Sequence, residues 1–183
     1  MKHTLRFRAY LSEDVASEAW RHIDILRQIR NHALRDYYRA DPTDRPSEYD
    51  QHDKLTEWKN RWPLFSEPSA HAAQRAVSQI HDDHETMQTR RENGYAVGRL
   101  HWQGAGEFRS VSYGQPSRWN VDHNTGDERF VRLRLEKIGW FEVRAERSVP
   151  PADEIEEIVL KKERTGEWYV SLVTPVGDTP EKP

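Results

Sequence analysis

The alternation of apolar and polar residues in the last third of the chain is the feature that most constrains its fold. Between residues 128 and 174, apolar side chains occupy every second position over several separate runs. This period places the apolar side chains on one face of an extended backbone, so each run predicts a half-buried strand. The predicted strands lie near 128–136, 140–146, 155–163 and 167–174, with turns at Lys137–Gly139 and Arg164–Gly166.

The first half of the chain predicts one more strand, followed by helices. Residues 4–10 (TLRFRAY) alternate, and apolar residues then recur at helical spacing from about residue 13 to 39. A second helix begins after Ser47, a favoured N-cap, and Pro63 ends it. A third helix starts at Ser66 or Ser69 and ends near Gly94, and residues 95–127 predict loops and short strands.

A strand separated from its siblings by a helical block predicts an α+β fold. We expect a small wedge-like β-barrel that is interrupted by a three-helix recognition insertion. The expected domains are the first barrel strand at 1–11, the helical insertion at 12–94, the rest of the barrel at 95–174, and a disordered tail or linker stub at 175–183.

Composition narrows the class of protein. The chain of 183 residues has no cysteine, which excludes disulfides, thiol catalysis and thiolate zinc sites. No run of apolar residues reaches the roughly 20 that span a membrane, and the N-terminus lacks an apolar signal core, so we expect a cytoplasmic protein. The formal net charge of −3 is unusual for a nucleic-acid binder, but the local distribution of charge decides binding.

Four segments, in order, resemble the N-terminal part of the TnpB/OrfB family of transposon-encoded proteins. The first is a basic strand and helix that ends in an Asn-x-Ala-Leu turn, and the second is a helix with Ser and Gln five positions apart. The third is an aromatic and basic strand before Gln-Pro, and the fourth is the pair of hairpins with an Ile-Gly-Trp turn. They cover residues 5–34, 66–80, 107–116 and 131–173.

The resemblance implies a function in transposition. Members of this family are RNA-guided DNA endonucleases, in which such a barrel and helical lobe hold a guide RNA and recognise a short DNA motif. A RuvC-like catalytic domain and a zinc ribbon follow in the family, and the chain stops about where they would begin. We therefore expect an RNA- and double-stranded-DNA-binding portion that is not itself an enzyme, has no cofactor, and has a full-length nuclease as a possible partner. An inert truncated remnant and a protein-interaction module are the alternatives.

Candidate nucleic-acid contacts fall on four segments. On the first strand, arginines and a tyrosine share the polar face, where they could hold phosphates and stack a base. On the first helix, Arg21, Arg27, Arg30 and Arg35 could follow a phosphate backbone, and an asparagine in a helix needs a partner or a helix end. The candidates on these two segments are Arg6, Arg8, Tyr10, Arg27, Arg30 and Asn31.

The other candidates lie on the third helix and on the strand before Gln-Pro. Glutamine and arginine can bind base edges, and aromatic rings on a strand can stack bases. These candidates are Gln74, Arg75, Ser78, Phe108, Arg109 and Tyr113. Each polar candidate could equally belong to a solvated face, and Phe108 and Tyr113 could belong to the core. We assign Trp140, Trp168 and Tyr169 to the barrel core rather than to ligand binding.

A histidine-rich run, HDDHE at 81–85, gives an alternative of another class, a metal-dependent hydrolase. His81 and His84 are three positions apart and could share a metal with a carboxylate. However, His84 falls on the apolar stripe of its helix, and the His-Glu-x-x-His pattern is absent. We therefore predict no metal site.

Overall fold

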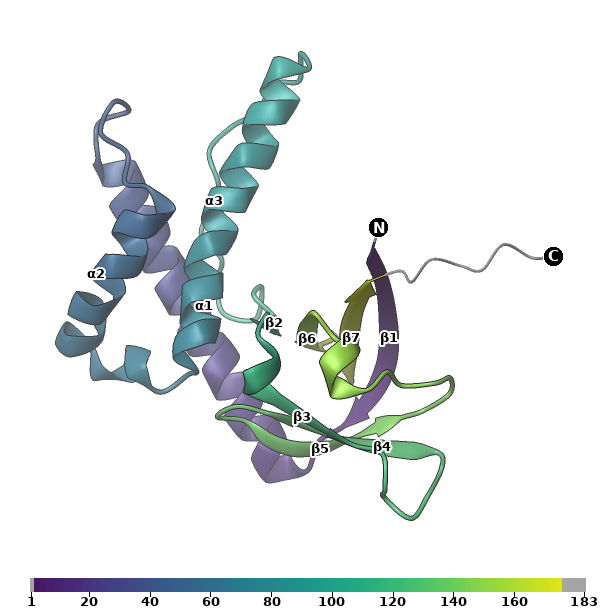
Figure 1. The fold of residues 1–183 in the computed structure, drawn as a ribbon. Coiled ribbons are helices and arrows are strands. Elements are labelled where there is room, and N and C mark those ends of the chain that lie inside the picture. Colours follow the sequence, from purple (N-terminus) through teal and green to yellow (C-terminus); the bar gives the residue numbers. More distant parts are fainter. Residues whose placement is uncertain (1, 176–183) are drawn as a thin grey trace. The chain divides into compact units, whose positions relative to one another are not determined.

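In the computed structural model, which describes residues 2–175, the elements follow the order predicted from the sequence (Figure 1). A strand is followed by three α-helices and then by six strands, with three short 3-10 helices (η1–η3) between them. The elements are β1 (Lys2–Tyr10), α1 (Glu13–Arg39), α2 (Glu48–Arg61), η1 (Pro63–Ser66), α3 (Ala70–Glu92), β2 (Ser110–Tyr113), η2 (Pro116–Arg118), β3 (Trp119–Asp122), β4 (Phe130–Leu135), β5 (Gly139–Arg144), η3 (Ala152–Glu154), β6 (Glu157–Lys162) and β7 (Trp168–Pro175). The predicted α+β class is confirmed. The tail predicted for 176–183 lies outside the described residues.

The chain forms two compact units. The sheet unit contains the described residues up to Arg21 and those from Arg109 on, and the helical unit contains His22–Phe108. The first turns of α1 belong to the sheet unit, and the rest of α1 belongs to the helical unit. The sequence pattern predicted the boundaries of the helical insertion between residues 11 and 12 and between residues 94 and 95.

The sheet unit holds one seven-stranded antiparallel sheet in the order β2-β6-β7-β1-β5-β4-β3. Strand β1 lies in its centre, with Phe7 opposite Val170 of β7 and Ala9 opposite Val143 of β5. Alternation explains the single apolar core, because the inward residues of every strand meet on the same face. Leu133, Leu135, Ile158, Leu160, Val170 and Leu172 are all fully buried there.

The sheet is open and does not close into the expected barrel. Within residues 2–175, β2 pairs only with β6 and β3 only with β4. In a flat sheet the six gaps between the seven strands would separate β2 from β3 by roughly 29 Å. The six residue steps from Tyr113 to Trp119 span at most about 22 Å, so the sheet must curl. The short helix η2 lies in the connection between the two edge strands.

Side-chain contacts from Tyr113 and from Trp20 add to the core of the sheet unit. The Tyr113 hydroxyl donates a 2.7 Å hydrogen bond to the carbonyl of Glu136, which follows β4. Trp20 of α1 packs edge-to-face on Trp168, with ring centroids 6.5 Å apart, and the Lys162 ammonium lies 4.7 Å from its ring. Helix α1 thus covers part of the core that the curled sheet alone would leave exposed.

The helical unit is built on the later turns of α1, on α2 and on α3. Ser47 caps α2 as predicted, since its side chain accepts from the Asp50 amide while the Asp50 carboxylate accepts from the Ser47 amide. Helix α2 ends at Arg61, two residues before Pro63. Buried aliphatic residues join the helices, among them Ile29, Leu34, Leu55, Val77 and Ile80. Residues 95–108 contain no helix or strand.

No helix among residues 2–175 is both long enough and apolar enough to cross a membrane.

Candidate nucleic-acid interface

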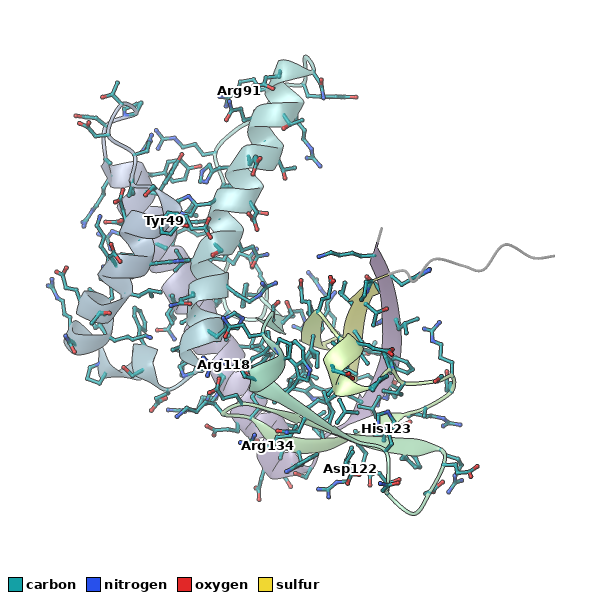
Figure 2. The ribbon with its side chains drawn as sticks, in the orientation of Figure 1. Tyr49, Arg91, Arg118, Asp122, His123 and Arg134 are labelled. Atoms are coloured by element: carbon teal, nitrogen blue, oxygen red, sulfur yellow. The ribbon has the colours of Figure 1, made fainter. Side chains whose placement is uncertain are left out.

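Arginine and aromatic side chains gather on the outer face of the sheet, opposite the apolar core. They come from β7, β1, β5 and β4, which are neighbours in the sheet. Alternation places them there, because each stands next to a buried residue of the opposite face, as Arg132 and Arg134 do beside Leu133. Figure 2 labels Arg134 of this set. We name this set the arginine–aromatic face: Arg6, Arg8, Tyr10, Phe130, Arg132, Arg134, Trp140, Arg144 and Tyr169.

Rings and guanidinium groups alternate in space across this face. The Arg6 guanidinium carbon lies 3.9 Å from the Tyr169 ring centroid, and that of Arg8 lies 5.1 Å from Tyr10. Tyr10 meets Phe130 edge-to-face with centroids 6.0 Å apart. On the neighbouring hairpin, Arg132 lies 5.1 Å from the Trp140 ring. Such cation–π contacts hold the rings and cations in one layer.

Charge is unevenly compensated along the face. On the β1 side, Arg6 pairs with Glu163 at 2.7 Å and Arg8 with Glu167 at 3.5 Å. On the β4 side, neither Arg132 nor Arg134 forms an ion pair within 4.0 Å among the described residues. Within residues 2–175, the Arg134 side chain donates only to the Asn120 side chain, at 3.2 Å.

Two acidic residues of this region, Glu142 of β5 and Asp122 of β3, stand opposite Arg132 in the strand register, and neither forms an ion pair with it within 4.0 Å among the described residues. Arg144 pairs with Glu146 at 3.5 Å, but both side chains are more than half exposed. Exposed pairs of this kind are weak and open readily to another anion. The β4–β5 hairpin therefore carries the more available positive charge.

The rings of the face are accessible. Tyr10 and Trp140 are each 39% exposed, which is high for large aromatic side chains. The prediction for Trp140 was therefore wrong, because it points outward and not into the core, and Tyr169 also lies on the outer face. Trp168 is buried, as predicted. The sequence pattern could have found Trp140, since it alternates with the buried Phe141, but its position beside a turn suggested a plug for a barrel end.

The structure brings Arg6, Arg8 and Tyr10 together on this face, as their alternation predicted. Arg132, Arg134 and Arg144 also lie on this face but were not predicted to contact nucleic acid. Their signal was present in the same alternation, but it could not show that β4 and β5 lie on the side of β1 away from β7.

The first-helix candidates lie in the helical unit, where they bind the chain itself. The Asn31 amide donates to the Gln103 carbonyl at 2.8 Å and accepts from the Gln103 amide at 3.1 Å. Arg27 also donates to the Gln103 carbonyl, at 3.1 Å, and Arg30 donates to the His101 carbonyl at 3.3 Å. Arg30 is buried, its nearest acid is Asp83 at 3.8 Å, and burial lowers the pKa of its guanidinium.

The third-helix candidates divide between solvent and neighbouring helices. The Gln74 side chain is exposed, and the backbone carbonyl oxygen of Gln74 lies 3.2 Å from the His52 Nε2 atom. The Ser78 hydroxyl lies 3.0 Å from the same His52 nitrogen, so it joins α3 to α2. Arg75 is half-buried on α3.

The strand candidates near β2 lie mainly in the interior. Phe108 and Tyr113 are buried, which is the core alternative for both, and burial raises the pKa of the Tyr113 hydroxyl far above its usual value. Arg109 donates to the carbonyls of Lys162 at 2.7 Å and Glu163 at 2.9 Å. Its guanidinium lies 4.9 Å from the Trp20 ring. These residues position the edge of the sheet.

The histidines of the 81–85 run are engaged by protein groups. His81 donates to the buried Gln51 side chain at 2.7 Å. His84 lies 2.7 Å from the Ile80 carbonyl and 2.9 Å from the Tyr38 hydroxyl, which itself accepts from the Leu100 amide. Burial lowers the pKa of both imidazoles. Across residues 2–175, no group of three or more histidine, aspartate or glutamate side chains could hold a metal ion.

Comparisons with protein-family models and with curated proteins gave no match to this chain.

Proposed function

We propose that this chain is the nucleic-acid-binding portion of a TnpB/OrfB-like transposon-encoded protein, that it acts in the cytoplasm, and that it has no catalytic role of its own. In this proposal it holds a guide RNA and recognises target DNA, and the arginine–aromatic face contacts the single-stranded RNA. The observation that carries the proposal is the accessible layer of rings and guanidinium groups on the outer face of β7, β1, β5 and β4.

The chemistry of this face suits single strands better than duplexes. Exposed rings such as Tyr10 and Trp140 offer π-faces to unpaired bases, and each stacked base contributes about 1–3 kcal/mol. Bases inside a duplex are already stacked on one another and cannot use such rings. Arg132 and Arg134, which have no ion pairs within the described residues, supply the phosphate contacts. Local positive charge of this kind is compatible with a net charge of −3.

The test is fluorescence anisotropy with a labelled single-stranded RNA and a duplex DNA of the same sequence, from 50 to about 300 mM salt. If Arg132, Arg134 and Arg144 each neutralise one phosphate, log K falls against log salt with a slope of about −2. Arg132→Ala should reduce the magnitude of this slope by about 0.7. Trp140→Ala should weaken binding of the RNA roughly tenfold or more, because it removes a stacking ring.

Arg91→Ala in α3 is the matched control, because Arg91 is an exposed arginine of the helical unit (Figure 2). It should leave RNA binding and its salt slope unchanged. Equal losses from Arg91→Ala and Arg132→Ala would show non-specific attraction and overturn the assignment of the face. Absence of RNA binding at 50 mM salt would overturn the proposal itself and favour a remnant or a protein-interaction module.

A further inference from the structure

A second set of exposed aromatic residues lies in the helical unit. Trp62, at the end of α2, is 38% exposed, and Trp102, in the segment after α3, is 55% exposed. Both line a groove of about 460 Å³, together with His32, Arg35, Arg61 and Phe65. A groove of this volume falls within the range of sites that bind small organic ligands. The groove thus presents two accessible indoles beside two arginines.

The exposed Trp102 is held in place from both sides. Its preceding neighbour His101 accepts from Arg30, and its following neighbour Gln103 accepts from Arg27 and Asn31. The Gln103 amide also donates to Asn31, which gives four hydrogen bonds between α1 side chains and the backbone of the two flanking residues. Holding a backbone segment in one conformation costs conformational entropy. The hydrogen bonds offset this cost for a residue whose large ring is exposed to solvent, as expected for a ring that binds a ligand.

Within residues 2–175, the arginines at the groove have no acidic partner within 4.0 Å. Neither Arg35 nor Arg61 forms an ion pair or donates a side-chain hydrogen bond to the rest of residues 2–175. Both are exposed, and the Arg61 guanidinium carbon lies 4.9 Å from the Trp62 ring centroid. Their side chains are therefore free to receive an anion at the mouth of the groove, and arginine suits a phosphate because its fork donates two parallel hydrogen bonds.

His32 adds a polar ring to the aromatic wall. Its centroid lies 4.5 Å from Trp58, 4.8 Å from Trp62 and 6.1 Å from Phe65. Burial, and also the nearby arginines, lower the pKa of His32, against an opposing effect of Asp36. A neutral imidazole carries one donor and one acceptor, and within the described chain neither ring nitrogen has a hydrogen-bond partner. The two ring nitrogens of His32 can therefore form hydrogen bonds with the edge of a planar heterocycle.

We propose that this groove binds one nucleotide, with the base against Trp62 and Trp102 and the phosphate between Arg35 and Arg61. His32 then hydrogen-bonds an edge of the base. The nucleotide can be a free mononucleotide or one residue extruded from a single strand, since the recognised chemistry is the same. The site is separate from the arginine–aromatic face, because all of its residues belong to the helical unit, so it stands even if the sheet binds no RNA.

The seven tryptophans provide a direct assay, because each gives one indole N–H signal in a nitrogen-15 NMR spectrum of the full chain. Single Trp→Phe replacements assign the signals. Titration with adenosine 5′-monophosphate should move the signals of Trp62 and Trp102 with saturation below about 10 mM. Inorganic phosphate should move them little, and adenosine should bind at least tenfold more weakly. Arg35→Glu with Arg61→Glu should weaken binding of the monophosphate at least tenfold, whereas Arg91→Glu should not.

The outcomes separate the two proposals and the two ligand sources. A 5′-phosphorylated trinucleotide that binds at least tenfold more tightly than the monophosphate identifies a strand residue, and equal affinities identify a free nucleotide. Movement of Trp140 reports the sheet, and movement of Trp62 and Trp102 reports the groove. Unmoved Trp62 and Trp102 signals at about 10 mM monophosphate would overturn the groove proposal. Adenosine and the monophosphate binding equally would overturn the role of Arg35 and Arg61.

Discussion

Replacement of Asn31 by alanine tests how the segment around Trp102 is held. Asn31 is only 8% exposed in the middle of α1, and its amide forms a reciprocal pair of hydrogen bonds with the backbone of Gln103. The substitution removes both bonds and leaves the Gln103 amide without this partner. The Gln103 carbonyl keeps its bond from Arg27. The backbone around Gln103 should therefore become less ordered mainly at its amide group.

The magnitude follows from two opposing effects. Each of the two hydrogen bonds contributes about 1 kcal/mol to stability, which gives a loss of about 2 kcal/mol. Alanine favours a helix interior over asparagine by about 0.5 kcal/mol. Asn31→Ala should therefore destabilise the protein by about 1.5 kcal/mol. The control is Asn60→Ala in the last turn of α2, where the asparagine is exposed and forms no side-chain hydrogen bond within the described chain. Because a helix end feels less of the interior propensity, this variant should change the stability by less than about 0.5 kcal/mol.

Urea denaturation of the full chain, followed by tryptophan fluorescence and by circular dichroism, measures both free energies of unfolding. Hydrogen exchange of the Gln103 amide gives a local readout, and Asn31→Ala should accelerate it while Asn60→Ala leaves it unchanged. If Asn31→Ala proves as stable as Asn60→Ala and the Gln103 amide keeps its protection, the clamp on this segment does not exist in solution. Trp102 would then not be held in place beside the groove.

Two further predictions concern ionisable groups of the sheet unit. Burial raises the pKa of Tyr113, so the folded protein keeps the hydroxyl proton after the unfolded chain has lost it, and stability should fall as the pH rises above about 10. In thermal melts, Tyr113→Phe should reduce this loss of stability at alkaline pH. At neutral pH the variant should be less stable by about 1 kcal/mol, because it lacks the hydrogen bond to the Glu136 carbonyl. An unchanged loss of stability at alkaline pH would contradict a buried hydroxyl. Hydrogen bonds from Arg129 lower the pKa of Asp127 to about 2. Arg129→Ala should therefore return this pKa toward 3.8, as measured by a carbon-13 NMR titration of the carboxyl group. An unchanged pKa would show that the two side chains do not pair.

Local sequence determined the helices and most of the strands. The helical period of α1 and the capping pair of Ser47 and Asp50 fixed element boundaries, since both depend on residues a few positions apart. Alternation in β4, β5, β6 and β7 determined which side chains face the core, because the strand period leaves no alternative once one face is buried. The polar face that now carries Arg6, Arg8 and Tyr10 could therefore be read from the sequence alone.

Other features depended on residues far apart in the chain. Arg27, Arg30 and Asn31 are residue types that often bind phosphates, and the sequence therefore suggested a phosphate-binding surface. Their carbonyl partners are more than 70 residues away in the chain, and no local sequence pattern predicts such partners. From the sequence, Tyr113 could be a base-stacking ring or a core residue. The curl of the sheet, which brings its hydroxyl to the Glu136 carbonyl, places it in the core.

The sequence by itself determined the α+β class, the element order and the orientation of side chains across each strand, because these follow from periodicity and from short-range hydrogen bonds. Only the tertiary structure decided which strands are neighbours, that the sheet stays open, and that Trp140 faces outward beside Arg132. It also brought Trp62 and Trp102 to one groove. The physical reason is that strand order and helix packing are fixed by the burial of the whole apolar surface at once, which no segment specifies alone.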